Sequence, residues 1–281
     1  IIPTKDKVEV LSVAVKSILE KTNYQNFKIT IVDNQSCEAK TFEFFDEYQA
    51  RFGNKIKVIK YDKEFNYSAI NNFAVDKSDA EIIGLINNDI EVINSDWLRE
   101  MVSHAYREDV GCVGAKLYFG NDTIQHAGVI TGIGGVAGHS HKYYDRNSSG
   151  YFDRLICCQQ LSAVTAACLL VKRELFEEVG GLNEANLKVA FNDVDFCLKI
   201  DKAGYRNIFT PYAELYHYES ISRGRDDDSP EKIKRFGNEV KYMIEKWSDE
   251  IDRKRVKLCR FYNPNLDKNK EDFSILPDHS E

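Results

Sequence analysis

The first third of the chain alternates short apolar runs with segments whose apolar residues recur every three or four positions. Leu11, Val15, Ile18 and Leu19 have the spacing of one helix face. The run at 28–32 is short and rich in β-branched residues, which is typical of a strand. The β–α repetition implies a parallel sheet with helices on both faces. The pattern predicts strands at 1–2, 28–32, 56–61 and 81–86, and helices around 11–19, 39–52 and 68–75.

The second half of the chain is less regular and richer in glycine. Residues 110–171 predict further strands of the same sheet and a long loop at 131–149. Helices are expected at 173–179 and 194–203. The tail beyond residue 261 is polar, and we expect it to be only partly ordered. A long amphipathic helix is predicted after residue 229, because one apolar stripe recurs there with charges opposite: Ile233, Phe236, Val240, Ile244, Trp247 and Ile251.

Composition narrows the functional classes. With 281 residues, 43% of them hydrophobic and 30% charged, the chain is an ordinary globular protein rather than a disordered or fibrous one. A net charge of -7 provides no field that favours a phosphate backbone, so nucleic-acid binding is not expected. Apolar runs such as 163–171 are too short to cross a bilayer.

Cysteine usage indicates the compartment. The seven cysteines are odd in number and form no C-x-x-C pair, which fits reduced thiols in a cytoplasm. We therefore expect a cytoplasmic protein and leave contact with the inner face of the plasma membrane open. The chain begins at Ile1 within an apolar run, and we expect it to be a fragment of a longer protein.

Polar residues follow each of the early strands. Thr4 and Asp6 follow the first, Asp33 the second, Asn66 the third, and Asn87-Asn88-Asp89 the fourth. The carboxyl ends of parallel strands share one edge of a sheet, where ligands bind. At any single position a turn or helix cap explains such a residue equally well. Four in succession favour one shared crevice.

The chain has no phosphate-cradling loop. A Walker sequence is absent, and the glycine-rich stretch at 132–137 is not followed by an amphipathic helix. A divalent cation, Mg²⁺ or Mn²⁺, is the physical alternative for neutralising a diphosphate. Asp89, at the end of a buried strand, and His217 are candidate ligands. For His217, a core histidine bonded to the backbone is the competing interpretation.

Several ordered blocks resemble the family 2 glycosyltransferases with the GT-A fold: 1–6, 31–34, 65–72, 85–92, 179–184, 191–198, 204–206 and 217–220. The resemblance covers residues 1–225 and is closest to bacterial O-antigen or capsule rhamnosyl- and galactosyltransferases. It implies an α/β GT-A domain over 1–225, with a mostly parallel central sheet flanked by helices. Residues 226–281 are then a helical extension and tail.

The resemblance also implies roles for individual residues. Asp193 would be the catalytic base, while Asp89 would be the last acid of the Asp-x-Asp metal motif. His217 would complete the metal or diphosphate site. The donor-binding residues would be Thr4, Asp6, Asp33, Asn66, Asn71, Asn88 and Arg223.

Two positions depart from the family pattern. Asn87-Asn88-Asp89 stands where Asp-x-Asp is usual, so one metal-binding carboxylate is missing. Asn192-Asp193 stands where Glu-Asp is usual, which retains the acid expected to act as base. His139 and His141, in the glycine-rich segment, are candidates to contact the acceptor or to close over the donor, or else are incidental loop residues.

The function implied is inverting sugar transfer. A nucleotide-diphosphate sugar, UDP- or dTDP-linked, would be the donor, and a glycan or lipid-linked glycan the acceptor. A catalytically degenerate scaffold that binds nucleotide or glycan is the alternative, supported by Asn87 and Asn192. A sugar-phosphate nucleotidyltransferase would need a glycine-rich, basic loop after the first strand, which residues 3–6 do not provide.

Overall fold

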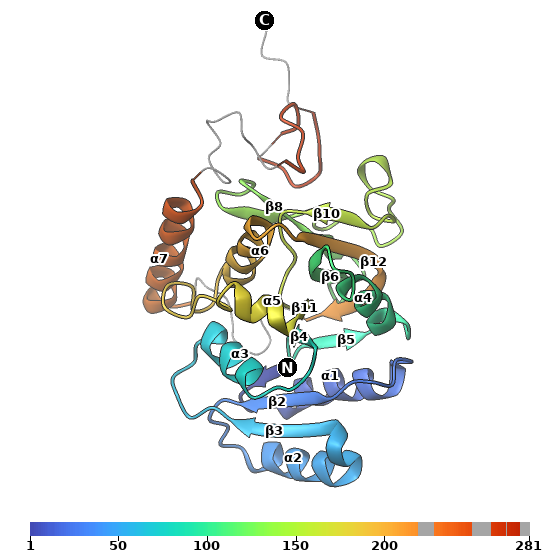
Figure 1. Cartoon of the computed structure of the whole chain (residues 1–281), viewed down its shortest axis with the longest axis vertical. Helices are drawn as coiled ribbons and strands as arrows, with labels where there is room; N and C mark the ends of the chain where they lie inside the picture. Colours follow the sequence, from blue (N-terminus) through green and yellow to red (C-terminus); the bar gives the residue numbers. More distant parts are fainter. Residues whose placement is uncertain (219–227, 249–259, 268, 276–281) are drawn as a thin grey trace, which may run out of the picture.

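Two β-sheets joined at their edges form the centre of the molecule (Figure 1). The computed structural model describes residues 1–218, 228–248, 260–267 and 269–275. The two sheets meet where the amide of Ile86 donates to the carbonyl of Ile1 (3.0 Å). The last strand of the β–α repeat therefore lies beside the first.

The smaller sheet is parallel, as predicted. It consists of β1 (Ile2–Thr4), β2 (Ile29–Asp33) and β3 (Ile56–Lys60), in the order β1-β2-β3. The connections are α1 (Val8–Lys21) and α2 (Ala39–Phe52), and α3 (Tyr67–Asp76) leads on to β4 (Ile82–Ile86). The helical spacing and the β-branched runs thus located these elements to within a few residues.

The larger sheet is mixed, which corrects the expectation of a mostly parallel sheet. Its order is β10-β12-β6-β11-β4, with β5 paired to β12 and β7 to β6. Only β6 and β12 are parallel; β11 is antiparallel to both of its neighbours. No crossover helix separates β6 from β7 or β10 from β11, so these connections do not impose a parallel direction. The strands are β5 (Ile90–Val92), β6 (Val110–Tyr118), β7 (Ile124–His126), β10 (Gln159–Leu161), β11 (Cys168–Lys172) and β12 (Arg206–His217).

Each face of the larger sheet has its own hydrophobic core. Leu169 and Val171 of β11 point into one core, whereas Leu170 points into the other. The first core is covered by α5 (Arg173–Glu178), α6 (Asn192–Lys202) and α7 (Pro230–Lys246), and the second by α1, α2 and α4 (Trp97–Ala105). Met243 and Trp247 belong to the first core, so this helical segment packs directly on the sheet domain. The domain division at 225/226 stays a prediction.

The segment at 131–149 is not one long loop, contrary to expectation. A hairpin of β8 (Val129–Thr131) and β9 (Ala137–His139) occupies its start, and Gly134 and Gly135 supply the positive φ angles of the turn. Part of the tail packs on this hairpin rather than extending away. Tyr262, Leu266 and Phe273 form a small core with the hairpin residues Ile130 and Ile133.

None of the helices within 1–218, 228–248, 260–267 and 269–275 combines the length and the apolar composition that a bilayer crossing requires.

We predict that the protein loses stability as the pH falls from 6.5 towards 4. His141 is buried, its Nε2 accepts the amide of Tyr151 (3.1 Å), and burial lowers its pKa to about 4. The unfolded chain then binds more protons than the folded one in this window, so the unfolding free energy falls with falling pH. His141→Gln should remove about 2 to 3 kcal/mol of that fall. Urea unfolding at several pH values measures it, and an unchanged pH slope in the variant would contradict it.

Candidate active site

The ends of three parallel strands meet at one edge, as the sequence predicted. Thr4 and Asp33 are register partners at the ends of β1 and β2. Asn88, after β4, donates from Nδ2 to Oγ1 of Thr4 (3.1 Å). The carboxylate of Asp33 accepts the amide of Ser36 (3.0 Å), which fixes the turn after β2. The side chains of Thr4, Asp33 and Asn88 are buried, whereas that of Ser36 is half-buried.

Asp89 and His217 come together from distant parts of the sequence. Oδ1 of Asp89 lies 3.2 Å from Nε2 of His217, and both side chains are largely shielded, with 8% and 12% exposed. Pairing of β5 with β12 sets this distance, because His217 is the register partner of Ile90. The amide of Tyr218 also donates to the carbonyl of Asp89 (2.8 Å).

Gln125 determines which nitrogen of His217 carries the proton. Nε2 of Gln125 donates to the carbonyl of His217 (3.2 Å), so its Oε1 faces Nδ1 of the ring at 2.6 Å as an acceptor. Nδ1 must therefore carry the hydrogen, and Nε2 presents its lone pair. The amide nitrogen of Asn87 donates to that lone pair (3.1 Å).

This arrangement fits a divalent cation. Oδ1 of Asp89 is buried without a hydrogen-bond partner and lies beside the lone pair of His217. A positive charge at this place would offset the repulsion between the two atoms, and a cation bound there would take the place of the Asn87 amide on Nε2 of His217. Adjacent ligands of an octahedral ion with bonds of about 2.1 Å lie roughly 3 Å apart, close to the spacing found here. One carboxylate and one imidazole leave room for phosphate oxygens and water.

Asp193 lies at the start of α6, close enough to Tyr67 for its charge to act on that residue, as the charge of Asp89 does. Oδ2 accepts the amide of Ala166 (3.0 Å), and Oδ1 accepts the amide of Val194 (2.8 Å). Burial raises the pKa of Asp193, and these backbone hydrogen bonds offset only part of the effect. A carboxylate with a raised pKa is a better proton acceptor than a solvated one.

Tyr67 connects the two halves of the site. Its hydroxyl lies 3.1 Å from the carbonyl of Ala166 and 3.2 Å from Oδ1 of Asn87. Burial raises the pKa of Tyr67, and the nearby charges of Asp193 and Asp89 raise it further, so the hydroxyl stays protonated. Because Ala166 also binds Asp193, a short chain of contacts links the two carboxylates.

The remaining residues that were predicted to bind the sugar donor hold loops and a helix start in place. The carboxylate of Asp6 accepts the amides of Cys37 and Glu38, each at 2.9 Å. Asn66 caps α3 and donates to the carbonyl of Glu184 (2.9 Å). Asn71 is buried and donates to the carbonyl of Tyr67. Arg223 lies outside the described residues. Their contact with a nucleotide remains a prediction.

Two further histidines, His126 and His139, lie near His217. Nδ1 of His126 lies 2.8 Å from Nδ1 of His139. Burial lowers the pKa of His126 well below its usual value and that of His139 to about 4, so both rings are neutral near pH 7. Both nitrogens of the His141 ring have partners inside the molecule, Nδ1 with the hydroxyl of Ser140 and Nε2 with the amide of Tyr151.

The sequence interpretation missed three residues. Tyr67 lay inside a recognised block, between residues already singled out, and its position there was an available signal. No signal in the sequence pointed to Gln125 or His126, because β7 joins the site only through its pairing with β6.

Comparison with known proteins identifies the family. The family described as "Glycosyl transferase family 2" matches residues 1–180. The chain belongs to glycosyl transferase family 2. This match includes the strand-end residues, Tyr67 and Asp89, and the GT-A fold explains their convergence.

Two relatives of this family 2 transferase domain match over most of its length. An uncharacterized protein, y4gI, of Sinorhizobium fredii is 52% identical over 275 residues, which is 98% of this chain and 30% of that protein. The O-antigen biosynthesis protein RfbC of Myxococcus xanthus is 37% identical over 232 residues, 82% of this chain and 18% of that protein. The chain thus spans less than a third of either relative.

Solved structures share the fold at low sequence identity. GalNAc-T7 with UDP, GalNAc and Mn²⁺ superposes with a TM-score of 0.66 at 14% identity, covering 88% of this chain and 48% of that one. The mannosyltransferase PcManGT of Pyrobaculum calidifontis, with GDP-Man and Mn²⁺, gives 0.62 at 15% identity, covering 88% and 62%. Both confirm the GT-A fold of the family 2 domain.

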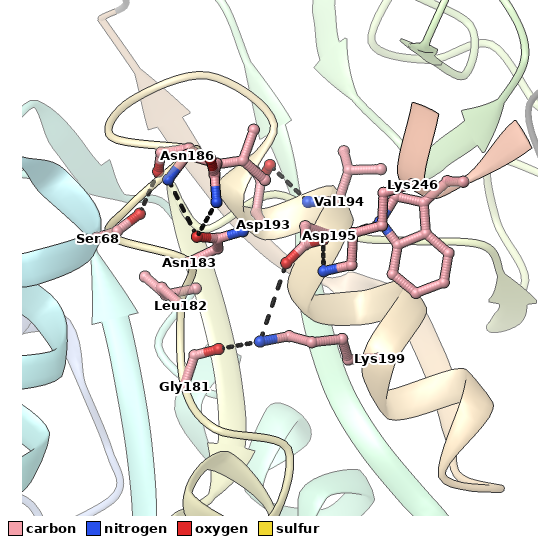
Figure 2. A network of polar contacts seen from close by, with 12 residues as sticks. Ser68, Gly181, Leu182, Asn183, Asn186, Asp193, Val194, Asp195, Lys199 and Lys246 are labelled. Carbon is pink, nitrogen blue, oxygen red and sulfur yellow. Dashed lines mark hydrogen bonds and ion pairs between the residues drawn. The ribbon is translucent and has the colours of Figure 1, made fainter. Parts of the chain in front are cut away.

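A buried ion pair supports the helix that carries Asp193 (Figure 2). Asp195 is fully buried, and its Oδ1 accepts from Nζ of Lys246 (2.6 Å) and from the indole nitrogen of Trp247 (2.8 Å). Lys199 lies 3.9 Å from Oδ2. The end of α7 is therefore tied to the first turn of α6.

We predict that Asp195→Asn lowers the unfolding free energy of this family 2 domain by about 2 to 3 kcal/mol, because the ammonium of Lys246 loses its buried partner. Urea unfolding measures the loss. Lys246→Met in the Asp195→Asn background should recover part of it. A loss below about 0.5 kcal/mol, as expected of a surface pair, would contradict the assignment.

Proposed function

We propose that the chain is an inverting glycosyltransferase that moves a sugar from a nucleotide-diphosphate donor to a hydroxyl of a glycan acceptor in surface polysaccharide synthesis. One observation carries the proposal: short chains of contacts connect the hydroxyl of Tyr67 both to the Asp89–His217 pair and to the carboxylate of Asp193. A leaving group held at one end and a base at the other is the geometry that a single displacement needs.

The donor side of the site is built to hold a diphosphate. Asp89 and His217 would be the protein ligands of a divalent cation, Mg²⁺ or Mn²⁺. When bound, such an ion neutralises charge on the departing diphosphate. Asn87, which stands where the family usually has a second acid, contacts Nε2 of His217 and the hydroxyl of Tyr67. A bound ion would take the place of its amide on Nε2 of His217. The Mn²⁺ in the two solved neighbours supports this assignment.

The acceptor side contains the base. Asp193 would take the proton of the acceptor hydroxyl as the new glycosidic bond forms. Its carboxylate is held by two backbone amides, so little reorganisation is needed when it receives the proton. Attack from the side opposite the leaving group inverts the configuration at the anomeric carbon.

The relatives suggest the substrate class. One is named for O-antigen biosynthesis. Another, an N-acetylglucosaminyl-diphospho-decaprenol L-rhamnosyltransferase of Mycobacterium tuberculosis, is 38% identical over 66 residues, 24% of this chain and 21% of that protein. The second name supports a lipid-linked glycan as acceptor, and the UDP in GalNAc-T7 supports a nucleotide-diphosphate sugar as donor. A UDP- or dTDP-sugar and a reaction at the cytoplasmic face of the membrane are part of the proposal.

Asp193→Asn should lower kcat by at least about 10²- to 10⁴-fold, because Asn cannot accept the proton. Nucleotide-diphosphate affinity, measured by calorimetry, should stay within a few-fold. Asp201→Asn, on the same helix and paired with Arg260, is the matched control and should keep its activity. Wild-type activity should fall as the pH drops through the raised pKa of Asp193. Full turnover by Asp193→Asn would refute the role.

The alternative function, a catalytically degenerate scaffold, predicts a different result for the wild-type protein. A degenerate domain binds nucleotide but transfers no sugar to any acceptor and hydrolyses no donor. Asn192, one of the residues that suggested it, donates to the carbonyl of Val189 (2.6 Å) and shapes the turn before Asp193. An Asn at this position, where the family usually has Glu, therefore has a structural role that is compatible with an active enzyme.

Gln125→Leu should weaken activation by Mn²⁺ about 10- to 100-fold, because His217 loses the partner that fixes its tautomer. Gln125→Glu keeps an acceptor for Nδ1 and should retain most of the activation. Titration of activity with Mn²⁺ separates the two variants. Equal activation constants for wild type and Gln125→Leu would be evidence against His217 as a ligand.

A further inference from the structure

A second cluster of ligand-type side chains lies outside the candidate active site. Glu100 and His104 occupy one face of α4, four residues apart, and Cys158 comes from the segment before β10. Their ligand atoms all lie within 4.8 Å of one another. In Figure 1, α4 lies against β6 and β12. This is the one group of three or more such side chains among the described residues that converges in this way.

Two of the three distances are close to the edges of a tetrahedral zinc site. Nε2 of His104 lies 3.0 Å from Oε1 of Glu100 and 3.7 Å from Sγ of Cys158. With bonds of about 2.3 Å to sulfur and about 2.0 Å to nitrogen or oxygen, neighbouring ligands of tetrahedral zinc lie roughly 3.3 to 3.6 Å apart. The third distance, between Glu100 and Cys158, is at most 4.8 Å, so these two atoms would move closer to share one ion.

A buried residue orients the cluster from behind. Thr210 of β12 is fully buried, and its hydroxyl donates to Oε1 of Glu100 (2.8 Å). The same hydroxyl lies 3.5 Å from Sγ of Cys158. Outer contacts of this kind hold ligands in place at metal sites. Side chains of Glu100 and His104 are 27% and 19% exposed, so an ion can reach them.

A helical Glu–His ion pair alone explains less. Pairs four residues apart are common on helices and stabilise them weakly. Such a pair does not account for a thiol from another segment at its third corner, nor for a buried hydroxyl that touches both the carboxylate and the thiol.

We propose that Glu100, His104 and Cys158 bind a zinc ion, with water as the fourth ligand. A thiolate with an imidazole and a carboxylate selects zinc over magnesium or manganese, which prefer oxygen. The ion would tie α4 to the segment that leads through β10 towards Thr165 and Ala166, both of which hydrogen-bond to Asp193. Its role would be structural, without contact with the reacting sugar.

Metal content and cobalt absorption test the site. Protein dialysed against zinc and then freed of loosely bound ions should keep one equivalent, measured by mass spectrometry. Substitution with Co²⁺ should give a sulfur-to-cobalt charge-transfer band, which Asp89 and His217 cannot produce because they offer no sulfur. Cys158→Ser and His104→Ala should lose the band and the equivalent of zinc bound there.

Matched controls exclude a general effect of cysteine removal or misfolding. Two control variants should keep both the zinc and the band: Cys157→Ser, one residue away, and Cys37→Ser, between β2 and α2. Circular dichroism of Cys158→Ser should match wild type. Wild-type protein without tightly held zinc, or an unchanged cobalt band in Cys158→Ser, would overturn the proposal.

Discussion

The candidate active site depends on two electron-rich atoms held close together in a buried place: the carboxylate oxygen of Asp89 and the lone pair of His217. Left alone, they repel each other. The fold holds them 3.2 Å apart because β5 pairs with β12 and because Gln125 keeps the proton on the far side of the imidazole. A positive charge would relieve this repulsion, which is why we propose that a divalent cation binds here together with the diphosphate of the donor.

The other half of the site is built from backbone rather than from charge. Amides of Ala166 and Val194 hold the carboxylate of Asp193. Tyr67, kept protonated by burial and by the nearby carboxylates, touches both the backbone that holds Asp193 and the asparagine that orients His217. These contacts connect the two ends of the candidate site.

The sequence predicted the parts of the fold that follow local rules. Helical spacing and β-branched runs located α1, α2 and the parallel strands, and the rule that strand ends share an edge brought Thr4, Asp33 and Asn88 together. The relative direction of the strands in the larger sheet could not be predicted, because the residue pattern of a strand does not show which strand pairs with it. Gln125 was missed for the same reason, and burial of His141 arises from Phe273, far along the chain.

The most direct test of the account is a crystal structure of the chain with UDP and Mn²⁺, using anomalous scattering at the manganese edge. The account predicts one strong peak bonded to Oδ1 of Asp89, Nε2 of His217 and oxygens of the diphosphate, with Asp193 across the same crevice. Manganese bound elsewhere on the chain, or a diphosphate seated without either residue, would contradict it.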